Sequence, residues 1–444
     1  MKSVYTRQAI VTLIVVFGIQ FLLSLLIYGV GIIHLALLDV YKKDDASTSV
    51  VGSLFINLMS ITGPLASYFI NRWGCRVTSA LGGILLVFGL GASFFAESFW
   101  MLMVTNGIIA GIGIGLTVLP CPVAIGYAFP KHSGIAMGIT TSAIGVGMLV
   151  SGPITQHLLN TYGLRGTFLL SAGIASHVLP CALLLNYSQV KERKAAQNTN
   201  RHKHFKTYIS LLHSPSYMCV LIGAILWNIS YAIIMIHLPS YVVHTGSSRE
   251  QASFMFTVIG IGTIVSRLTI GLAIGPEGLD PLLLNFGLTA FVGTLIITFP
   301  LYITFSFGPL IFASLYGIYS GGLLVFTVPL CLEMAGTDRL TSAVGLWFFL
   351  LGLGSLTGPP IAGLVLDVTG SYKYSYILSG LFVLLASGFS LLASIWRESK
   401  DEKLQSTEFS LSPMIKEADD FEKVNFDDVL SSREQGVKLL SNNT

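Results

Sequence analysis

Long apolar runs, separated by short polar stretches, follow one another along the chain as far as residue 396. A helix needs roughly 20 apolar residues to cross a bilayer, because each backbone polar group must be satisfied within its own segment. The pattern predicts an all-α membrane protein with twelve transmembrane helices, six on each side of one polar stretch. The predicted spans are 8–37, 49–70, 77–96, 99–128, 134–157, 165–188, 215–240, 251–274, 282–303, 307–332, 340–366 and 374–396.

The composition indicates the same class of protein. Hydrophobic residues make up 53% of the chain and charged residues only 11%, with a mean hydropathy of +0.74. A soluble domain carries about 25% charged residues. The first apolar run is too long for a cleaved signal peptide and has no small-residue cleavage pattern behind it. None of the five cysteines lies where an extracellular disulfide is expected, so we expect a fold that does not depend on one.

Lys and Arg are unevenly distributed between the predicted loops. With both termini on the cytosolic side, twelve basic residues fall in inner loops before the tail, against five in outer loops. This imbalance predicts cytosolic termini, because basic loop residues tend to stay on the cytosolic side. The net charge of +3 reflects these topological residues and indicates no nucleic-acid partner.

The chain repeats part of itself within apolar sequence. Residues 134–163 align without a gap on residues 341–370, and nine of the thirty aligned positions are identical. Most identities are glycine or proline, which mark backbone constraints such as close helix contact and kinks. Two similar halves in a membrane are what a transporter needs to expose a central site to each side in turn.

We therefore expect two pseudo-symmetric six-helix bundles, at residues 1–188 and 215–397. Residues 189–214 are basic and poor in apolar residues, which predicts a cytosolic linker that could also contact anionic lipid. Residues 398–444 contain too few apolar residues to fold alone, so we predict a disordered cytosolic tail.

Arg267 lies well inside the predicted span 251–274. Moving a guanidinium to the middle of a bilayer costs at least ~2.5–3.5 kcal/mol, so this side chain should face the bundle interior or an aqueous cavity. Its planar fork could hold both oxygens of an anionic substrate's carboxylate. It could equally cap helix carbonyls or pair within the bundle, although the residues one turn away are Thr263 and Gly271 rather than carboxylates.

A second self-match joins the first and seventh spans. Residues 28–35 resemble residues 231–238, and each segment places a histidine six residues after a tyrosine. His34 and His237 could bind substrate or carry a proton near neutral pH, or they could be polar residues near the outer ends of their spans. Tyr28 and Asn228 are further substrate-binding candidates, although each could instead pack or hydrogen-bond between helices.

The sequence carries no clustered catalytic chemistry. The glycines of the fourth span lie inside an apolar helix with no Lys-Ser/Thr pair behind them, which excludes a phosphate-binding loop. Cys and His do not occur at zinc spacing, and no acyl-transfer triad signature is present. We expect no metal, no cofactor and no enzymatic activity.

The loop after the second span resembles a known transporter motif. Asn71, Arg72, Gly74 and Arg76 resemble the loop between spans two and three of the major facilitator superfamily, with Asn71 where an Asp is usual. These residues are candidates for a role in gating.

Two further segments resemble the monocarboxylate transporter family within that superfamily. In residues 127–138, an aromatic pair precedes Lys131, His132 and small residues, as in the signature entering span five. Residues 358–372, which include Asp367, resemble the family's span eleven and the turn after it. Asp367 could equally be an interfacial or capping carboxylate.

The resemblance implies a carrier of small organic anions that works by alternating access, with Arg267 matching the family's span-eight arginine. Proton-coupled members carry a Lys where this sequence has Ile32 and an Asp where it has Thr263. We therefore expect a secondary or facilitative transporter of small organic acids other than a typical lactate–proton symporter. The alternatives are a carrier of an amino acid, an amine or another neutral or zwitterionic solute, and a non-transporting receptor on the same fold.

The resemblance also bears on location and partners. It implies an integral, multi-pass protein of the plasma membrane, with the lipid bilayer around it and a small organic anion as its substrate. A single-pass glycoprotein chaperone is a candidate partner, because related carriers often travel with one.

Overall fold

The computed structural model describes residues 7–41, 45–185, 201–275 and 278–397. The chain divides into two compact units, Met1–Ala393 and Ser394–Thr444. The predicted tail at 398–444 and the linker residues 189–200 lie outside the described residues. We call residues 7–185 the first sequence half and residues 201–393 the second.

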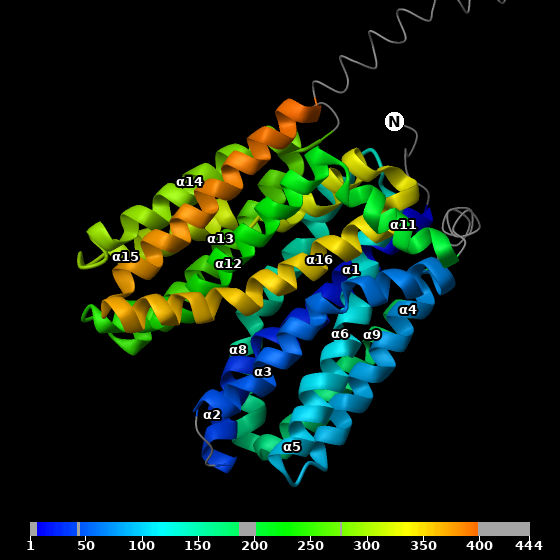
Figure 1. Ribbon diagram of the computed structural model, residues 1–444. Helices are drawn as coiled ribbons and strands as arrows, with labels where there is room; N and C mark the ends of the chain where they lie inside the picture. Colours follow the sequence, from blue (N-terminus) through cyan, green and yellow to red (C-terminus); the bar gives the residue numbers. More distant parts are fainter. Residues whose placement is uncertain (1–6, 42–44, 186–200, 276–277, 398–444) are drawn as a thin grey trace, which may run out of the picture. The chain divides into compact units, whose positions relative to one another are not determined.

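The described residues form helices and no strand (Figure 1). The first half contains α1 (Arg7–Tyr28), α2 (Val30–Tyr41), α3 (Asp45–Ile61), α4 (Gly63–Phe94), α5 (Phe99–Leu102), η1 (Met103–Ala110), α6 (Gly111–Val118), α7 (Pro120–Ala128), α8 (Ser133–Ser176) and α9 (Val178–Leu183). The second contains α11 (Arg201–Leu212), α12 (Pro215–His244), α13 (Arg249–Ala273), α14 (Pro281–Tyr302), α15 (Gly308–Ser320), η2 (Leu323–Phe326), α16 (Thr327–Thr369) and a last helix, Tyr372–Arg397.

Among the described residues, nine helices are long and apolar enough to cross a membrane, and several of them contain a turn at a single glycine. Three long helices turn at Gly74, Gly163 and Gly336, where φ is 85°, 66° and 72°. Only glycine adopts this backbone region readily. Division at these turns separates spans two and three, five and six, and ten and eleven, as the apolar pattern predicts. The predicted all-α transmembrane fold is confirmed.

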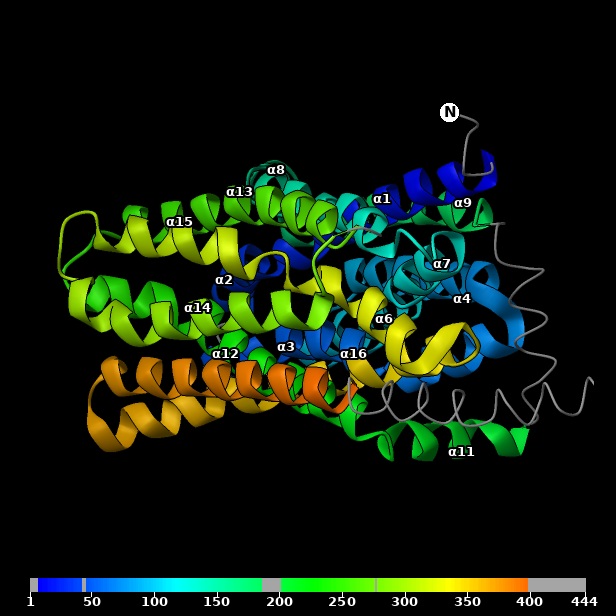
Figure 2. The same ribbon diagram turned by 90° about the horizontal axis from the view of Figure 1, so that it is seen from above.

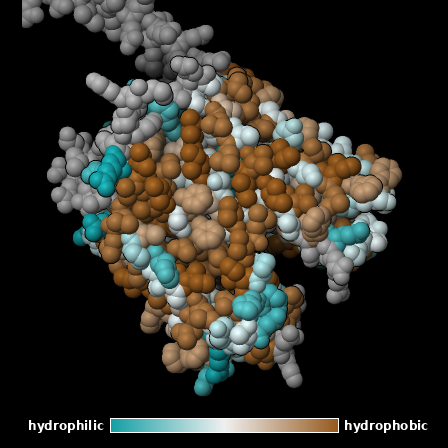
Figure 3. All heavy atoms as spheres, turned by 180° about the vertical axis from the view of Figure 1, so that it is seen from behind, coloured by the Kyte–Doolittle hydropathy of each residue, from teal (hydrophilic) through white to brown (hydrophobic). Residues whose placement is uncertain are grey.

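The face of the molecule in Figure 3 is apolar over most of its area. Large side chains such as Phe88, Trp100 and Leu272 are more than 60% exposed. A soluble monomer rarely exposes apolar patches of this extent, whereas lipid tails cover them without cost. The chain is therefore an integral, multi-pass membrane protein.

The first predicted span is broken, although its apolar pattern runs on without interruption. The break falls at Gly29, between α1 and α2. A Cβ atom at Gly29 would lie 2.5 Å from Oγ1 of Thr155, so glycine allows α8 to approach the broken turn. Ser151 Oγ also donates to the carbonyl of Leu25 over 2.7 Å, which holds α8 against α1.

The two sequence halves meet through small residues on α8 and α16. Figure 2 shows α13 running beside α8, and a Cβ at Gly138 of α8 would lie 2.9 Å from the Cα of Gly271 on α13. At the equivalent repeat position on α16, a Cβ at Gly345 would lie 3.0 Å from the carbonyl oxygen of Gly63 on α4. The internal repeat therefore supplies two corresponding contacts between the halves. The division into two separate bundles stays a prediction.

A further contact between the halves, and the helix α11, lie at the end predicted to be cytosolic. The buried hydroxyls of Tyr127 and Thr341 are 3.1 Å apart, at the end of α7 and within α16. The described part of the predicted linker forms α11, where Leu211 is 2% exposed and Ser210 accepts a hydrogen bond from Arg339 over 3.1 Å. This part of the linker is therefore a packed helix rather than a loose tether.

Candidate substrate site

Arg267 lies inside the helix bundle, with 5% of its surface exposed. It stands on α13, whose N-terminus is fixed by a capping box between Ser248 and Gln251. Thr263 and Gly271, one turn away on either side, carry no charge. Because the side chain is buried, the guanidinium avoids contact with lipid, which would be costly for a charged group.

The guanidinium hydrogen-bonds two backbone carbonyls. Nε donates to Gly321 over 2.9 Å, and Nη1 donates to Thr141 of α8 over 2.5 Å. Gly138 makes the second bond possible, because a Cβ there would lie 2.5 Å from the carbonyl oxygen of Arg267 and would hold the helices apart. Within the described residues, Arg267 makes no ion pair, and its Nη2 makes no hydrogen bond.

Two tyrosines lie beside this cation. Tyr28, the last residue of α1, and Tyr231 of α12 both interact electrostatically with Arg267. The two tyrosines also interact electrostatically with each other, and they come from opposite sequence halves. The repeated segments 28–35 and 231–238 therefore bring their tyrosines together next to Arg267.

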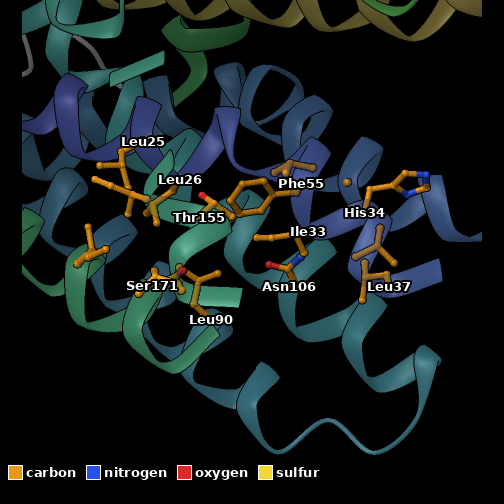
Figure 4. A pocket seen from close by; sticks show the side chains of 16 residues that line it. Leu25, Leu26, Ile33, His34, Leu37, Phe55, Leu90, Asn106, Thr155 and Ser171 are labelled. Carbon is orange, nitrogen blue, oxygen red and sulfur yellow. The ribbon is translucent and has the colours of Figure 1, made fainter. Parts of the chain in front are cut away.

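The two histidines of the same repeat lie elsewhere. His34 lines a small cavity within the first half, and Figure 4 shows its ring directed away from Asn106 of that cavity. The ring centroid of His237 is 6.2 Å from that of Tyr372, next to an aromatic cluster. No contact joins either histidine to Arg267 among the described residues.

Asn228 serves a contact between helices. Its Nδ2 donates to the backbone carbonyl of Leu351 on α16. A Cβ at Gly354, on the next turn of α16, would lie 3.2 Å from the Cβ of Asn228. The amide thus reinforces close packing of α12 on α16, which is the structural alternative that the sequence left open.

The motif residues occupy turns and helix ends. Gly74 forms the turn of α4, and Arg72 next to it donates to the hydroxyl of Tyr68 over 3.1 Å. Asn71 and Arg76 flank the same turn, and each has an interaction partner. The other motif residues lie at helix ends: Lys131 and His132 lie between α7 and α8, and Asp367 is exposed near the end of α16. All of them lie away from Arg267 in the chain, and none contacts it in the described residues.

The arrangement of helices is shared with known transporters. The sequence profile of the Major Facilitator Superfamily matches residues 10–334. This chain belongs to the Major Facilitator Superfamily. Two solved structures of the superfamily show the same fold at 14% identity. The E. coli fucose:proton symporter has a TM-score of 0.71 and covers 87% of this chain and 99% of its own. A human organic anion transporter has a TM-score of 0.68, and the match covers 86% of this chain and 99% of the transporter.

Within the superfamily, the chain is similar to proteins named monocarboxylate transporters. Monocarboxylate transporter 12 of Xenopus laevis is 26% identical over 398 residues, which cover 80% of this chain and 82% of the relative. Monocarboxylate transporter 4 of Mus musculus is 27% identical over 374 residues, which cover 82% of this chain and 78% of the relative. The resemblance to this family is confirmed. This superfamily member is a membrane transporter of a small molecule, and its relatives are transporters rather than enzymes.

Sequence reasoning missed part of the site. Tyr231 was signalled by its match to Tyr28, but the histidines in the same match drew attention away from it. Thr141 and Gly321 contribute only backbone carbonyls, which any residue could supply. Their role follows from the approach of α8 and the end of α15 to α13, and no residue type in the sequence marks it.

Proposed function

We propose that this protein carries small organic acids across the membrane by alternating access, and that Arg267 binds the substrate carboxylate. The observation that supports this most strongly is a buried guanidinium whose partners are neutral carbonyls. A buried cation without a counter-ion is costly, and an anionic substrate would remove that cost on binding. The relatives named monocarboxylate transporters support the same substrate class.

The geometry of Arg267 suits a carboxylate. The guanidinium presents five N–H donors in a planar fork, and Nη2 has no partner within the described chain. A carboxylate can take two parallel hydrogen bonds from such a fork, which are stronger than those between neutral groups. The hydroxyls of Tyr28 and Tyr231, beside the cation, can contact the rest of a small substrate.

Proton coupling of the lactate-symporter kind is not part of the proposal. Thr263 stands one turn before Arg267 and Ile32 one turn after Tyr28, and neither side chain can bind a proton in the physiological range. Uptake of an anion against an inside-negative potential is opposed by ~2.3 kcal/mol per charge per 100 mV unless a cation moves with it. We therefore expect net efflux, exchange of anions, or uptake driven by a steep gradient.

Location and assembly belong to the same proposal. The distribution of basic residues supports cytosolic termini. The plasma membrane and a single-pass glycoprotein chaperone are proposed from the sequence resemblance alone. The repeated sequence supports two six-helix bundles, at residues 1–188 and 215–397, that rock about Arg267.

Flux into proteoliposomes tests the proposal. Purified full-length protein is reconstituted, and uptake of a panel of labelled small carboxylates, amino acids and amines is measured at two external pH values. We expect saturable carboxylate flux that changes little with pH, and none in protein-free liposomes. Flux of amino acids or amines alone would establish the neutral or zwitterionic carrier instead. Absence of flux for every solute would favour a receptor.

A further inference from the structure

A small cavity lies within the first sequence half, apart from the candidate substrate site. It measures about 30 Å³, and α1, α2, α3, α4, η1 and α8 supply its walls. Figure 4 shows that leucines and Phe55 form much of the lining. Neither Arg267 nor the two tyrosines beside it belong to the lining.

Three polar side chains of the lining lack partners. Asn106 is 5% exposed, and Thr155 and Ser171 are each 6% exposed. In the part of the chain that the structure describes, none of the three makes a hydrogen bond through its side chain. Buried amides and hydroxyls in native proteins are almost always hydrogen-bonded to protein or to ordered water. These three groups therefore indicate an occupant of the cavity.

The local structure leaves this space open. Asn106 stands on η1, a π-helix whose turn is wider than that of an α-helix and which interrupts the fourth span. Thr155 faces Gly29, where the first span breaks. Other buried hydroxyls of the first half are satisfied without the cavity: those of Thr105 and Ser93 are 2.9 Å apart, and Thr140 donates to the carbonyl of Ala136 over 2.8 Å.

We infer that the cavity binds one or two water molecules, which join Asn106, Thr155 and Ser171 into one hydrogen-bonded cluster. The volume fits this number, because one water needs roughly 10–15 Å³ by this measure. Water can both donate to the oxygens and accept from the amide and hydroxyl hydrogens. An apolar occupant would leave all three groups unpaired.

A sodium ion is the other small occupant, and the lining does not favour it. A cation accepts no hydrogen bond, so the amide and hydroxyl hydrogens would stay unsatisfied. The lining contains no Asp or Glu to balance a charge in a low-dielectric interior. Water therefore satisfies the cavity at lower cost.

Apolar substitutions of similar size test whether the three groups share an occupant. The variants are Asn106→Leu, Thr155→Val, Ser171→Ala and the triple variant, each measured as full-length protein by thermal unfolding. Each single change leaves a shared water short of a partner and should lower the apparent Tm by about 2 °C. The triple change removes every polar partner, so its effect should be clearly smaller than the sum of the three.

Thr140→Val is the matched control, because its hydroxyl bonds within its own helix. Its effect should add to that of Asn106→Leu. Effects of the three lining variants that also add would overturn the inference.

Two measurements on the unmodified protein decide the identity of the occupant. A high-resolution map should contain a density peak within hydrogen-bonding distance of Asn106, and the Tm should be equal in sodium chloride and N-methyl-D-glucamine chloride. An empty cavity would contradict the inference. A Tm raised by sodium in the wild type but not in Asn106→Leu would show a cation site in its place. Neither result depends on which solute the protein carries.

Discussion

Arg267 donates a hydrogen bond from Nη1 to the backbone carbonyl of Thr141 over 2.5 Å, from α13 to α8. The two residues belong to opposite sequence halves, so the bond joins the halves beside the proposed substrate position. A carboxylate held by the same guanidinium would compete with the Thr141 carbonyl for Nη1. Substrate binding and contact between the halves are thereby linked, which is what alternating access requires.

Substitution of Arg267 should remove transport. Arg267→Ala should abolish carboxylate flux, and Arg267→Lys should lower kcat/KM by about 10–100-fold, because an ammonium cannot reproduce the two parallel bonds. Flux in cells is measured together with the amount of protein at the cell surface. Arg339→Lys is the control, since Arg339 is exposed and, within the described residues, its guanidinium hydrogen-bonds only the hydroxyl of Ser210. Normal flux through Arg267→Lys would refute recognition by the planar fork.

The hydroxyls of Tyr28 and Tyr231 should act as a pair. Tyr28→Phe and Tyr231→Phe each remove one of the two hydroxyls that interact with each other beside Arg267. Each should raise KM by about 2–10-fold, the range for one hydrogen bond, and the double variant should be little worse than either single one. Tyr374→Phe, at an exposed position, should be neutral. Independent, fully additive effects would show that the two hydroxyls do not cooperate.

The repeated glycines should tolerate no side chain. In Gly138→Ala the new Cβ would lie 2.5 Å from the carbonyl oxygen of Arg267, and in Gly345→Ala it would lie 2.7 Å from the Cβ of Ser67. Each should lower the free energy of unfolding by about 1–3 kcal/mol and should also lower flux. Gly173→Ala is the matched control on α8, because nothing lies within 4 Å of its Cβ position. Equal flux in all three variants would argue against close contact between the halves.

A carboxylate placed one turn before Arg267 should create pH dependence. In Thr263→Asp, the ionised carboxylate would pair with the guanidinium and compete with the substrate. Protonation at low pH would free Arg267, so uptake should rise as the pH falls, whereas wild-type uptake should change little. Thr263→Asn has nearly the same shape but does not titrate, and its uptake should stay flat. Strong stimulation of wild-type lactate uptake by acid would contradict the account.

Much of the fold could be predicted because lipid restricts the choices. Apolar runs had to be helices, and the turns fell at glycines such as Gly74 and Gly163, which separate the predicted spans. The interior position of Arg267 followed from the cost of its charge in lipid. Both conclusions need only the sequence and the fact that lipid does not solvate polar or charged groups.

The details of the site depended on contacts that the sequence does not encode locally. The self-match identified the correct pair of helices but suggested His34 and His237, whereas Tyr28 and Tyr231 lie beside Arg267. Six residues separate each tyrosine from its histidine, and along the continuous helix α12 this is about 9 Å, which is enough to take His237 out of the site. The break at Gly29 and the π-helix at Asn106 lie inside unbroken apolar sequence, so hydropathy could not reveal them.

The central claim is that a buried guanidinium recognises a carboxylate, and competition in proteoliposomes tests it most directly. Exchange of a labelled small carboxylate is measured in the presence of the unlabelled acid or its primary amide, for the wild type and for Arg267→Lys. We predict that the acid competes with the label in the wild type and the amide does not, and that the lysine variant exchanges far less label. Equal competition by acid and amide, or undiminished exchange in the variant, would contradict the claim.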